Sequence, residues 1–134
     1  MKKDKRKIFI SYSYKDAEYV KTLRKTLTSL LPDVIILDPG SQVFLGEKVA
    51  DKISKMLIES DMVITVLTPE SVYNPNIILE FGMAVSLGKK VIPIAKQNTD
   101  LSLLPFNMRE RNIIVNTGPK STAQRLAKEM FVVE

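Results

Sequence analysis

The sequence contains neither histidine nor cysteine. Without these residues the protein lacks the imidazole general acid–base, the thiolate nucleophile and the usual zinc ligands. The absence of cysteine also excludes a disulfide scaffold and is typical of a protein in the reducing cytoplasm. Any chemistry must therefore use carboxylates, hydroxyls and backbone groups, and we expect no metal site and no cofactor.

Long apolar runs are missing too. No stretch approaches the length of a membrane span, and Lys7-Ile8-Phe9-Ile10 leads directly into polar residues, so the N-terminus has no apolar signal core. The sequence therefore predicts no membrane span and a cytoplasmic location.

Positive charge is in excess, but the excess is partly local. The formal net charge is +5, and basic residues crowd the start of the chain at Lys2, Lys3, Lys5, Arg6 and Lys7. Elsewhere both signs alternate, and the chain lacks the alternation of basic and aromatic residues on which single-stranded nucleic acids stack. We expect a solvated basic flank over residues 1–7 and no binding to nucleic acid.

Apolar β-branched runs alternate with amphipathic stretches along the 134 residues, of which 45% are apolar and 26% charged. The length suits a single domain over residues 1–134, and the alternation predicts an α/β sandwich of five parallel strands and roughly five helices. Pro75 is expected in the first turn of a helix that stops at Gly88. The predicted strands span 8–12, 34–37, 62–67, 91–94 and 113–115, and the main predicted helices span 16–30, 49–60, 75–87 and 122–131.

The usual phosphate-binding motifs are absent. Five residues separate Gly82 from Gly88, which breaks the spacing of a P-loop, and Lys90 stands where that motif needs Ser or Thr. No G-x-G-x-x-G follows the first predicted strand. These absences exclude a kinase, a P-loop NTPase and a dehydrogenase with the usual dinucleotide fingerprint.

Glu80 is an isolated acid in the apolar run Ile77-Ile78-Leu79-Glu80-Phe81. Ligands of open parallel sheets bind outside the carboxyl ends of the strands, and the helix that carries Glu80 starts at that edge. Because burying an unpaired charge is costly, we expect Glu80 at the wall of a pocket there. The alternative is a surface acid that the positive end of the helix dipole favours.

An ordered set of motifs resembles the TIR (Toll/interleukin-1 receptor) domain over essentially the whole chain. The motifs are Lys7-Ile-Phe-Ile-Ser-Tyr-Ser13 with Asp16, the loop from Asp38 to Gly46, Ser60-Asp61 with the apolar run to Thr68, and Glu80 followed by Gly88-Lys-Lys-Val-Ile-Pro-Ile94. The resemblance implies a flavodoxin-like three-layer sandwich with a five-stranded parallel sheet. It also implies that the loop from Asp38 to Gly46 governs self-association and lies over a nucleotide site.

In the enzymatic members of that family, a glutamate in the helix after the third strand cleaves NAD+ between nicotinamide and ribose, and Glu80 occupies its position. NAD+ is then the substrate, not a cofactor. Nicotinamide leaves from a pyridinium that is already cationic, so no general acid is needed and the missing histidine is no obstacle. One carboxylate beside the ribose can stabilise its oxocarbenium-like transition state.

The resemblance also implies residues that contact the substrate. Ser11, Tyr12 and Ser13 would meet the pyrophosphate and ribose, Asp38, Phe44 and Gly46 would cover the nicotinamide side, and Thr68 and Asn76 would line the floor. Asn76 stands where many members have Trp, and the Arg pair of some animal members is missing. The polar residues could instead serve turns, and the aromatic ones packing.

Three functions remain open. The first is an NAD+ glycohydrolase or cyclase that acts as the effector of a prokaryotic antiviral or immune signalling system and is activated by oligomerisation. The second is a non-enzymatic module for TIR–TIR interaction, and the third is an N-glycosidic enzyme like the nucleoside deoxyribosyltransferases. The expected partners are NAD+, other TIR domains in a homo-oligomer or filament, and a sensor domain that is fused or separate.

Overall fold

A five-stranded, fully parallel sheet forms the centre of the computed structural model, which describes residues 6–39, 49–104, 113–116 and 118–132. The strands are β1 (Arg6–Ser11), β2 (Val34–Leu37), β3 (Met62–Leu67), β4 (Lys90–Lys96) and β5 (Ile114–Asn116). Their order across the sheet is β2-β1-β3-β4-β5, which is the flavodoxin-like order. The predicted fold class is therefore confirmed.

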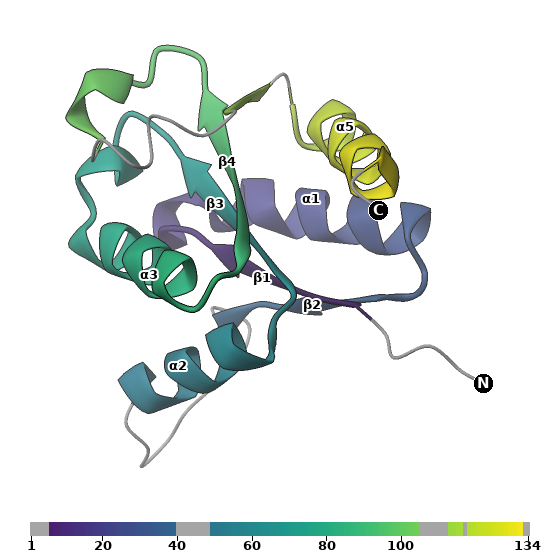
Figure 1. The fold of residues 1–134 in the computed structure, drawn as a ribbon. Coiled ribbons are helices and arrows are strands. Elements are labelled where there is room, and N and C mark those ends of the chain that lie inside the picture. The colour runs from purple at the N-terminus through teal and green to yellow at the C-terminus, as the bar shows by residue number, and fades with distance from the viewer. Residues whose placement is uncertain (1–5, 40–48, 105–112, 117, 133–134) are drawn as a thin grey trace.

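Helices cover both faces of the sheet (Figure 1). The α-helices of the described residues are α1 (Ala17–Leu30), α2 (Val49–Glu59), α3 (Pro75–Ser86) and α5 (Pro119–Val132), and short 3-10 helices occur at η1 (Tyr14–Asp16), η3 (Ser71–Tyr73) and η4 (Leu101–Leu103). Helices α1 and α5 pack together on one face, while α2 and α3 lie on the other (Figure 1). None of the helices in this part of the chain is long and apolar enough to cross a membrane.

Some element boundaries differ from those predicted. Strand β1 begins at Arg6, because its pairing with β2 starts there, so the strand takes in the last two residues of the predicted basic flank. Strand β4 is longer than predicted because its pairing with β3 runs from Lys90 to Ala95. Helix α5 begins at Pro119, where a proline is tolerated because the first helical N–H needs no partner.

The alternation of side chains along β1 decides which face each residue meets. Ile8 and Ile10 belong to the core under α1 and α5, whereas Phe9 belongs to the core under α2 and α3. Because successive side chains of a strand point to opposite faces, Ser11 faces α3, and Tyr12, just after the strand, packs against the core under α1. The side chains of Ser11 and Tyr12, although adjacent in the sequence, therefore lie on opposite sides of the sheet.

Local capping holds α3 in place. The side chain of Asn74 accepts the backbone N–H of Asn76 at 2.9 Å, and Pro75 fills the first helical position. At the other end Gly88 has a φ of +71°, and the Lys89 N–H donates to the Ala84 carbonyl at 3.0 Å. The predicted roles of Pro75 and Gly88 are confirmed, and the two ends place Glu80 in the second turn of the helix.

Candidate functional site

The candidate site lies where β1 and β3 end side by side. Helix α1 follows β1 on one face of the sheet, and α3 follows β3 on the other face. In open parallel sheets, ligands bind at such a point because the two connections diverge and leave a crevice outside the carboxyl ends of the strands. Ser11 and Leu67 are the last residues of the two strands.

Glu80 approaches this point from α3. The Ser11 hydroxyl, which is fully buried, donates to Glu80 Oε1 at 2.6 Å, and this contact joins residues that lie 69 positions apart in the sequence. Burial raises the pKa of the Glu80 carboxyl above its ordinary value, while the hydrogen bond from Ser11 opposes that rise. A carboxylate that served only the helix dipole would need neither the burial nor this bond.

A second acid, Asp38, lies on the α1 side of the sheet. It accepts the Tyr12 hydroxyl on Oδ1 at 2.6 Å and pairs with Arg24 Nη1 through Oδ2 at 3.1 Å. The Asp38 side chain is only 5% exposed, and the Arg24 side chain is 30% exposed. Burial and the bond to Asp38 raise the pKa of the Tyr12 hydroxyl, so it stays protonated and continues to donate.

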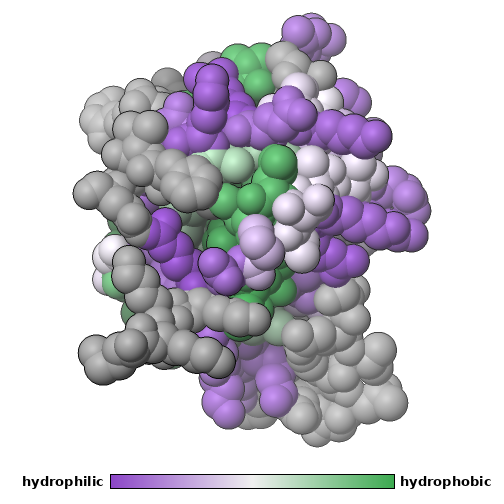
Figure 2. All heavy atoms as spheres, turned by 90° about the vertical axis from the view of Figure 1, so that its right-hand side faces the viewer, coloured by the Kyte–Doolittle hydropathy of each residue, from purple (hydrophilic) through white to green (hydrophobic). Residues whose placement is uncertain are grey.

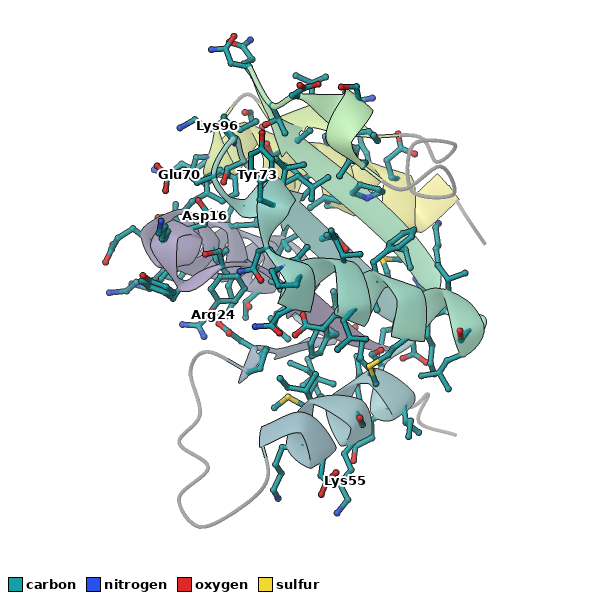
Figure 3. All side chains as sticks on the ribbon, turned by 90° about the vertical axis from the view of Figure 1, so that its left-hand side faces the viewer. Asp16, Arg24, Lys55, Glu70, Tyr73 and Lys96 are labelled. Carbon is teal, nitrogen blue, oxygen red and sulfur yellow. The ribbon has the colours of Figure 1, made fainter. Side chains whose placement is uncertain are left out.

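A third cluster joins the two loops at the rim. The Thr68 hydroxyl donates to Asp16 Oδ2 at 3.2 Å, and the Thr68 N–H donates to Ser71 Oγ at 2.8 Å. Burial raises the pKa of Asp16, and the bond from Thr68 opposes the rise. An exposed ion pair between Lys15 and Glu70, at 3.5 Å, spans the same two loops. Figure 3 shows Asp16, Glu70 and Lys96 at one end of the molecule, well away from Lys55 on α2.

The remaining predicted residues are placed as follows. Ser13 is buried, and its hydroxyl accepts the Lys15 N–H at 3.3 Å, which is the local bonding of a turn. Asn76 is exposed one turn before Glu80. Phe44 and Gly46 lie outside the described residues. The structure thus brings Ser11 and Glu80 together, brings Tyr12 and Asp38 together, and separates the two pairs by the sheet.

Two polar residues that bond to the predicted site residues were not predicted, although the sequence contains a pattern that indicates each of them. Arg24 follows Val20 by four positions and precedes Leu27 by three, so it lies beside the apolar stripe of α1, and a cation there needs a buried partner. Ser71 follows Thr68 by three positions across a proline, a spacing that suits reciprocal bonds between side chain and backbone in a turn.

The α5 side of the molecule offers no comparable chemistry. Figure 2 shows mostly hydrophilic residues on this face around a smaller hydrophobic area. A shallow depression of about 560 Å³ is lined by polar residues of one helix: Ser121, Gln124, Arg125, Lys128 and Glu129. All of these side chains are exposed. The half-buried Glu80 at the switch point is therefore the stronger candidate.

The candidate site combines the Glu80 carboxylate with several hydroxyls, and Asp16 and Asp38 lie nearby with partners of their own. Within residues 6–39, 49–104, 113–116 and 118–132, no group of three or more acidic side chains could hold a metal ion. A partly desolvated carboxylate with a fixed orientation can stabilise a positive charge that develops beside it. The fold and this carboxylate together define the chain as a flavodoxin-like α/β domain with a partly buried acid, Glu80, at its switch point.

The chain belongs to the TIR domain family, because the profile of that family matches residues 8–127. The TIR domain of the Toll-related receptor TRR-2 from Hydra magnipapillata has a TM-score of 0.72 at 16% sequence identity, over 93% of this chain and 94% of the other. A comparison with curated protein sequences gives no match.

Two further solved structures share the fold. The CMP N-glycosidase BcmB from Clostridium botulinum has a TM-score of 0.62 at 18% identity, over 90% of this chain and 98% of that one. The TIR domains of the activated Roq1 resistosome, which recognises the pathogen effector XopQ, also have a TM-score of 0.62, at 15% identity, over 95% of this chain and 73% of that one. At such identities the likeness concerns the fold.

Proposed function

We propose that this TIR domain cleaves NAD+ at the bond between nicotinamide and ribose, with Glu80 as the catalytic carboxylate. The observation that carries the proposal is the 2.6 Å hydrogen bond between Ser11 and Glu80 at the switch point of the sheet. This bond holds a partly buried acid where a nucleotide would bind in a flavodoxin-like fold. The family membership and the raised pKa of Glu80 support the same function.

The proposed reaction needs little beyond this carboxylate. As the C1′–N bond breaks, its electron pair passes to the cationic pyridinium, and neutral nicotinamide leaves without a proton. Positive charge then develops on the ribose, and the ionised Glu80 stabilises it through the low-dielectric surroundings that burial provides. A water molecule or a hydroxyl of the ligand adds to C1′ and loses a proton, which gives ADP-ribose or a cyclised product.

The other predicted contacts belong to the proposal in different ways. Ser13, Thr68 and Asn76 follow the carboxyl ends of β1 and β3, and we propose that they line the substrate site around Glu80. Tyr12 and Asp38 are hydrogen-bonded to each other on the α1 side. We therefore propose that they shape the rim of the site and do not contact the substrate directly. Phe44 and Gly46 keep their proposed place over the nicotinamide, outside the described residues.

The biological role proposed for the domain is that of a cytoplasmic effector in an immune signalling system. Its proposed partners are other TIR domains, in an oligomer or filament that forms on activation, and a fused or separate sensor. The fold likeness to TIR domains in an activated resistosome supports this assembly-dependent role. A prokaryotic antiviral function is the version that we favour.

A second candidate is an N-glycosidase that acts on a nucleotide or deoxynucleoside other than NAD+. The fold likeness to a CMP N-glycosidase favours it, because that protein matches this chain over nearly its full length. The leaving group separates the two candidates chemically. Cytosine is neutral and must be protonated to leave easily, whereas nicotinamide departs from a cation. Besides Glu80, Asp16 at the same rim is an acid that could supply that proton, because burial raises its pKa.

The deciding experiment measures nicotinamide release from NAD+ by the purified protein, at high concentration and with a crowding agent. Wild type is compared with Glu80→Gln, which keeps the size of the side chain and removes its charge. Glu59→Gln, at an exposed site at the end of α2, serves as the matched control. Parallel samples receive CMP or a deoxynucleoside in place of NAD+.

We expect release by wild type and the control, and loss of release in a folded Glu80→Gln protein. Base release from CMP or the deoxynucleoside alone would establish the second candidate. If no substrate is cleaved even when the protein is clustered, the enzyme proposal fails. A concentration-dependent increase in size would then support the TIR–TIR interaction module.

A further inference from the structure

Strand β3 contains one polar residue, Thr65, in the otherwise apolar run Met62-Val63-Ile64-Thr65-Val66-Leu67. Its side chain is fully buried, and its hydroxyl has no hydrogen-bond partner in the part of the chain that the structure describes. Valine has nearly the same shape and would avoid the cost of burying an unpaired hydroxyl. The presence of threonine in the most buried strand therefore calls for a physical reason.

The position of Thr65 points to the Glu80 site. Val63 and Leu67 belong to the core under α2 and α3, so Thr65, which lies between them in the strand, faces α3 as well. In the pairing of β1 with β3, Thr65 is directly opposite Ser11. Side chains at paired positions of a parallel sheet point to the same face, and neighbouring strands lie about 5 Å apart. Thr65 thus lies next to the serine whose hydroxyl holds Glu80.

The neighbour on the other side offers Thr65 nothing polar. Its partner in β4 is Pro93, whose side chain is an apolar ring. Ser11, in contrast, uses its only proton in the bond to Glu80 and keeps lone pairs that can accept a hydrogen bond. A staggered rotation about χ1 of Thr65 exchanges the places of its hydroxyl and methyl groups and can aim the hydroxyl at either neighbouring strand.

We propose that Thr65 is a positioning residue for Glu80: after rotation about χ1, the Thr65 hydroxyl donates to Ser11 and extends a hydrogen-bonded series through Ser11 to the carboxylate. This inference rests on the proposed role of Glu80. Donation to Ser11 fixes the rotamer of the serine and polarises its O–H, because linked hydrogen bonds strengthen one another. The effect on the carboxylate is a firmer orientation and a more stable ionised form.

Few other ionisable groups share these surroundings. Helix α3 packs against β1, β3 and β4, and β3 carries no ionisable residue. The ionisable residues on the other two strands and on the preceding turn are Arg6, Lys7, Lys90, Lys96 and Tyr73. None of them shifts the pKa of Glu80, which burial raises and the Ser11 bond lowers. A change in that pKa in Thr65→Val that is absent in Thr65→Ser would therefore trace to the Thr65 hydroxyl.

The test compares Thr65→Val, which keeps the shape and removes the hydroxyl, with Thr65→Ser, which keeps the hydroxyl. We expect Thr65→Val to unfold at an equal or higher urea concentration than wild type but to lose about fivefold in kcat with little change in KM, roughly the effect of one neutral hydrogen bond. Thr65→Ser should retain most of the wild-type kcat. Thr122→Val, at a buried position on the α5 side, controls for general effects of removing a buried hydroxyl.

A second readout does not depend on activity. The Glu80 carboxyl carbon is assigned in 13C NMR spectra by its loss in Glu80→Gln, and its titration is followed in each variant. We expect the pKa of Glu80 to be higher in Thr65→Val than in wild type and unchanged in Thr65→Ser.

The outcomes separate the two levels of the proposal. If wild type releases no nicotinamide, the proposed function fails, but the NMR titration still decides whether Thr65 acts on Glu80. If Thr65→Val matches wild type in both the titration and kcat, the positioning role is overturned. Equal losses in Thr65→Val and Thr65→Ser would also overturn it, because they would trace the effect to packing and not to the hydroxyl.

Discussion

Two acids flank the end of β1 on opposite faces of the sheet, and their surroundings differ in kind. Asp38, on the α1 side, has a cationic partner in Arg24 and a donor in Tyr12. Glu80, on the α3 side, receives one hydrogen bond from Ser11, and burial raises its pKa. An acid that already has a cation holds structure together, whereas an acid without one is free to stabilise a cation that a substrate brings.

The contrast also explains why both acids tolerate burial. Arg24 offsets the desolvation of Asp38, since the charges meet at 3.1 Å. Glu80 is partly exposed to solvent and has no cationic partner among the described residues, and burial raises its pKa. The raised pKa means that part of the cost of desolvating the carboxylate remains in the folded protein. Such uncompensated cost is typical of a functional group.

The largest expected effect is a difference in activity between these acids. Glu80→Gln should lower kcat for nicotinamide release by about a hundredfold or more, because it removes the charge that stabilises the transition state. Asp38→Asn should lower kcat by less than tenfold, since its effect reaches the site only through the shape of the rim. Steady-state kinetics of both variants check this. Equal losses would abolish the distinction between a catalytic and a structural acid.

The next largest effect concerns stability, where Asp38 should matter more than Glu80. Asp38→Asn should destabilise the fold by about 1–3 kcal/mol, because it leaves Arg24 without its counter-charge and weakens the bond from Tyr12. Glu80→Gln should leave stability unchanged or increase it, since a partly buried charge is removed. Urea denaturation measures both.

A double-mutant cycle sharpens this prediction. Arg24→Met keeps a long apolar side chain at this position of α1 and removes the charge. If the ion pair is the source of the stabilisation, Asp38→Asn should cost less in the Arg24→Met background than in wild type. Strictly additive losses would mean that Asp38 stabilises the fold through contacts other than Arg24, such as the bond from Tyr12.

A smaller effect should appear in the pH dependence of Ser11→Ala. The proposed reaction needs ionised Glu80, so kcat falls as the pH drops through the pKa of that group. The Ser11 bond lowers this pKa, and its removal should move the acidic limb of the pH–rate profile to higher pH. A limb that stays in place or moves to lower pH would show that Ser11 does not stabilise the carboxylate.

The smallest effect is expected at the exposed rim. Glu70→Gln breaks the ion pair with Lys15. The Lys15 side chain is 54% exposed and the Glu70 side chain is 69% exposed. Solvent screens such pairs, so we expect a stability change within about 0.5 kcal/mol and unchanged kcat. A larger loss in urea denaturation would indicate that the two loops of the rim depend on this pair.

Much of the fold could be predicted because it depends on local patterns. Strands β2 and β3 have the predicted boundaries, since both are unbroken runs of strand-forming residues, β-branched over 34–36 and 63–66 and closed by leucine. The ends of α3 were also predictable, because proline at a helix start and glycine after a helix end act through the backbone of a few neighbouring residues. Boundaries failed where tertiary pairing extended an element, as at Arg6 and Lys96.

The candidate site was predictable in location and in its main residue, but not in its internal bonding. Topology indicated that Glu80 would lie at the carboxyl edge of the sheet, and the family resemblance implied Ser11, Asp38 and Thr68 beside it. The partners of each acid depend on which face of the sheet each side chain meets, and Ser11 and Tyr12 diverge although they are adjacent. Arg24 and Ser71 became visible as partners only through the packed structure.

The amino-acid sequence was enough to establish the order of strands and helices, the absence of histidine and cysteine chemistry, and the unusual place of Glu80, because each of these depends on composition or on short-range periodicity. The tertiary structure decided that Glu80 is held by Ser11 while Asp38 is held by Arg24 and Tyr12. Those bonds join residues up to 69 positions apart. Such contacts follow from strand order, from the alternation of side chains and from the faces that the helices cover, and these are set only when the sheet assembles.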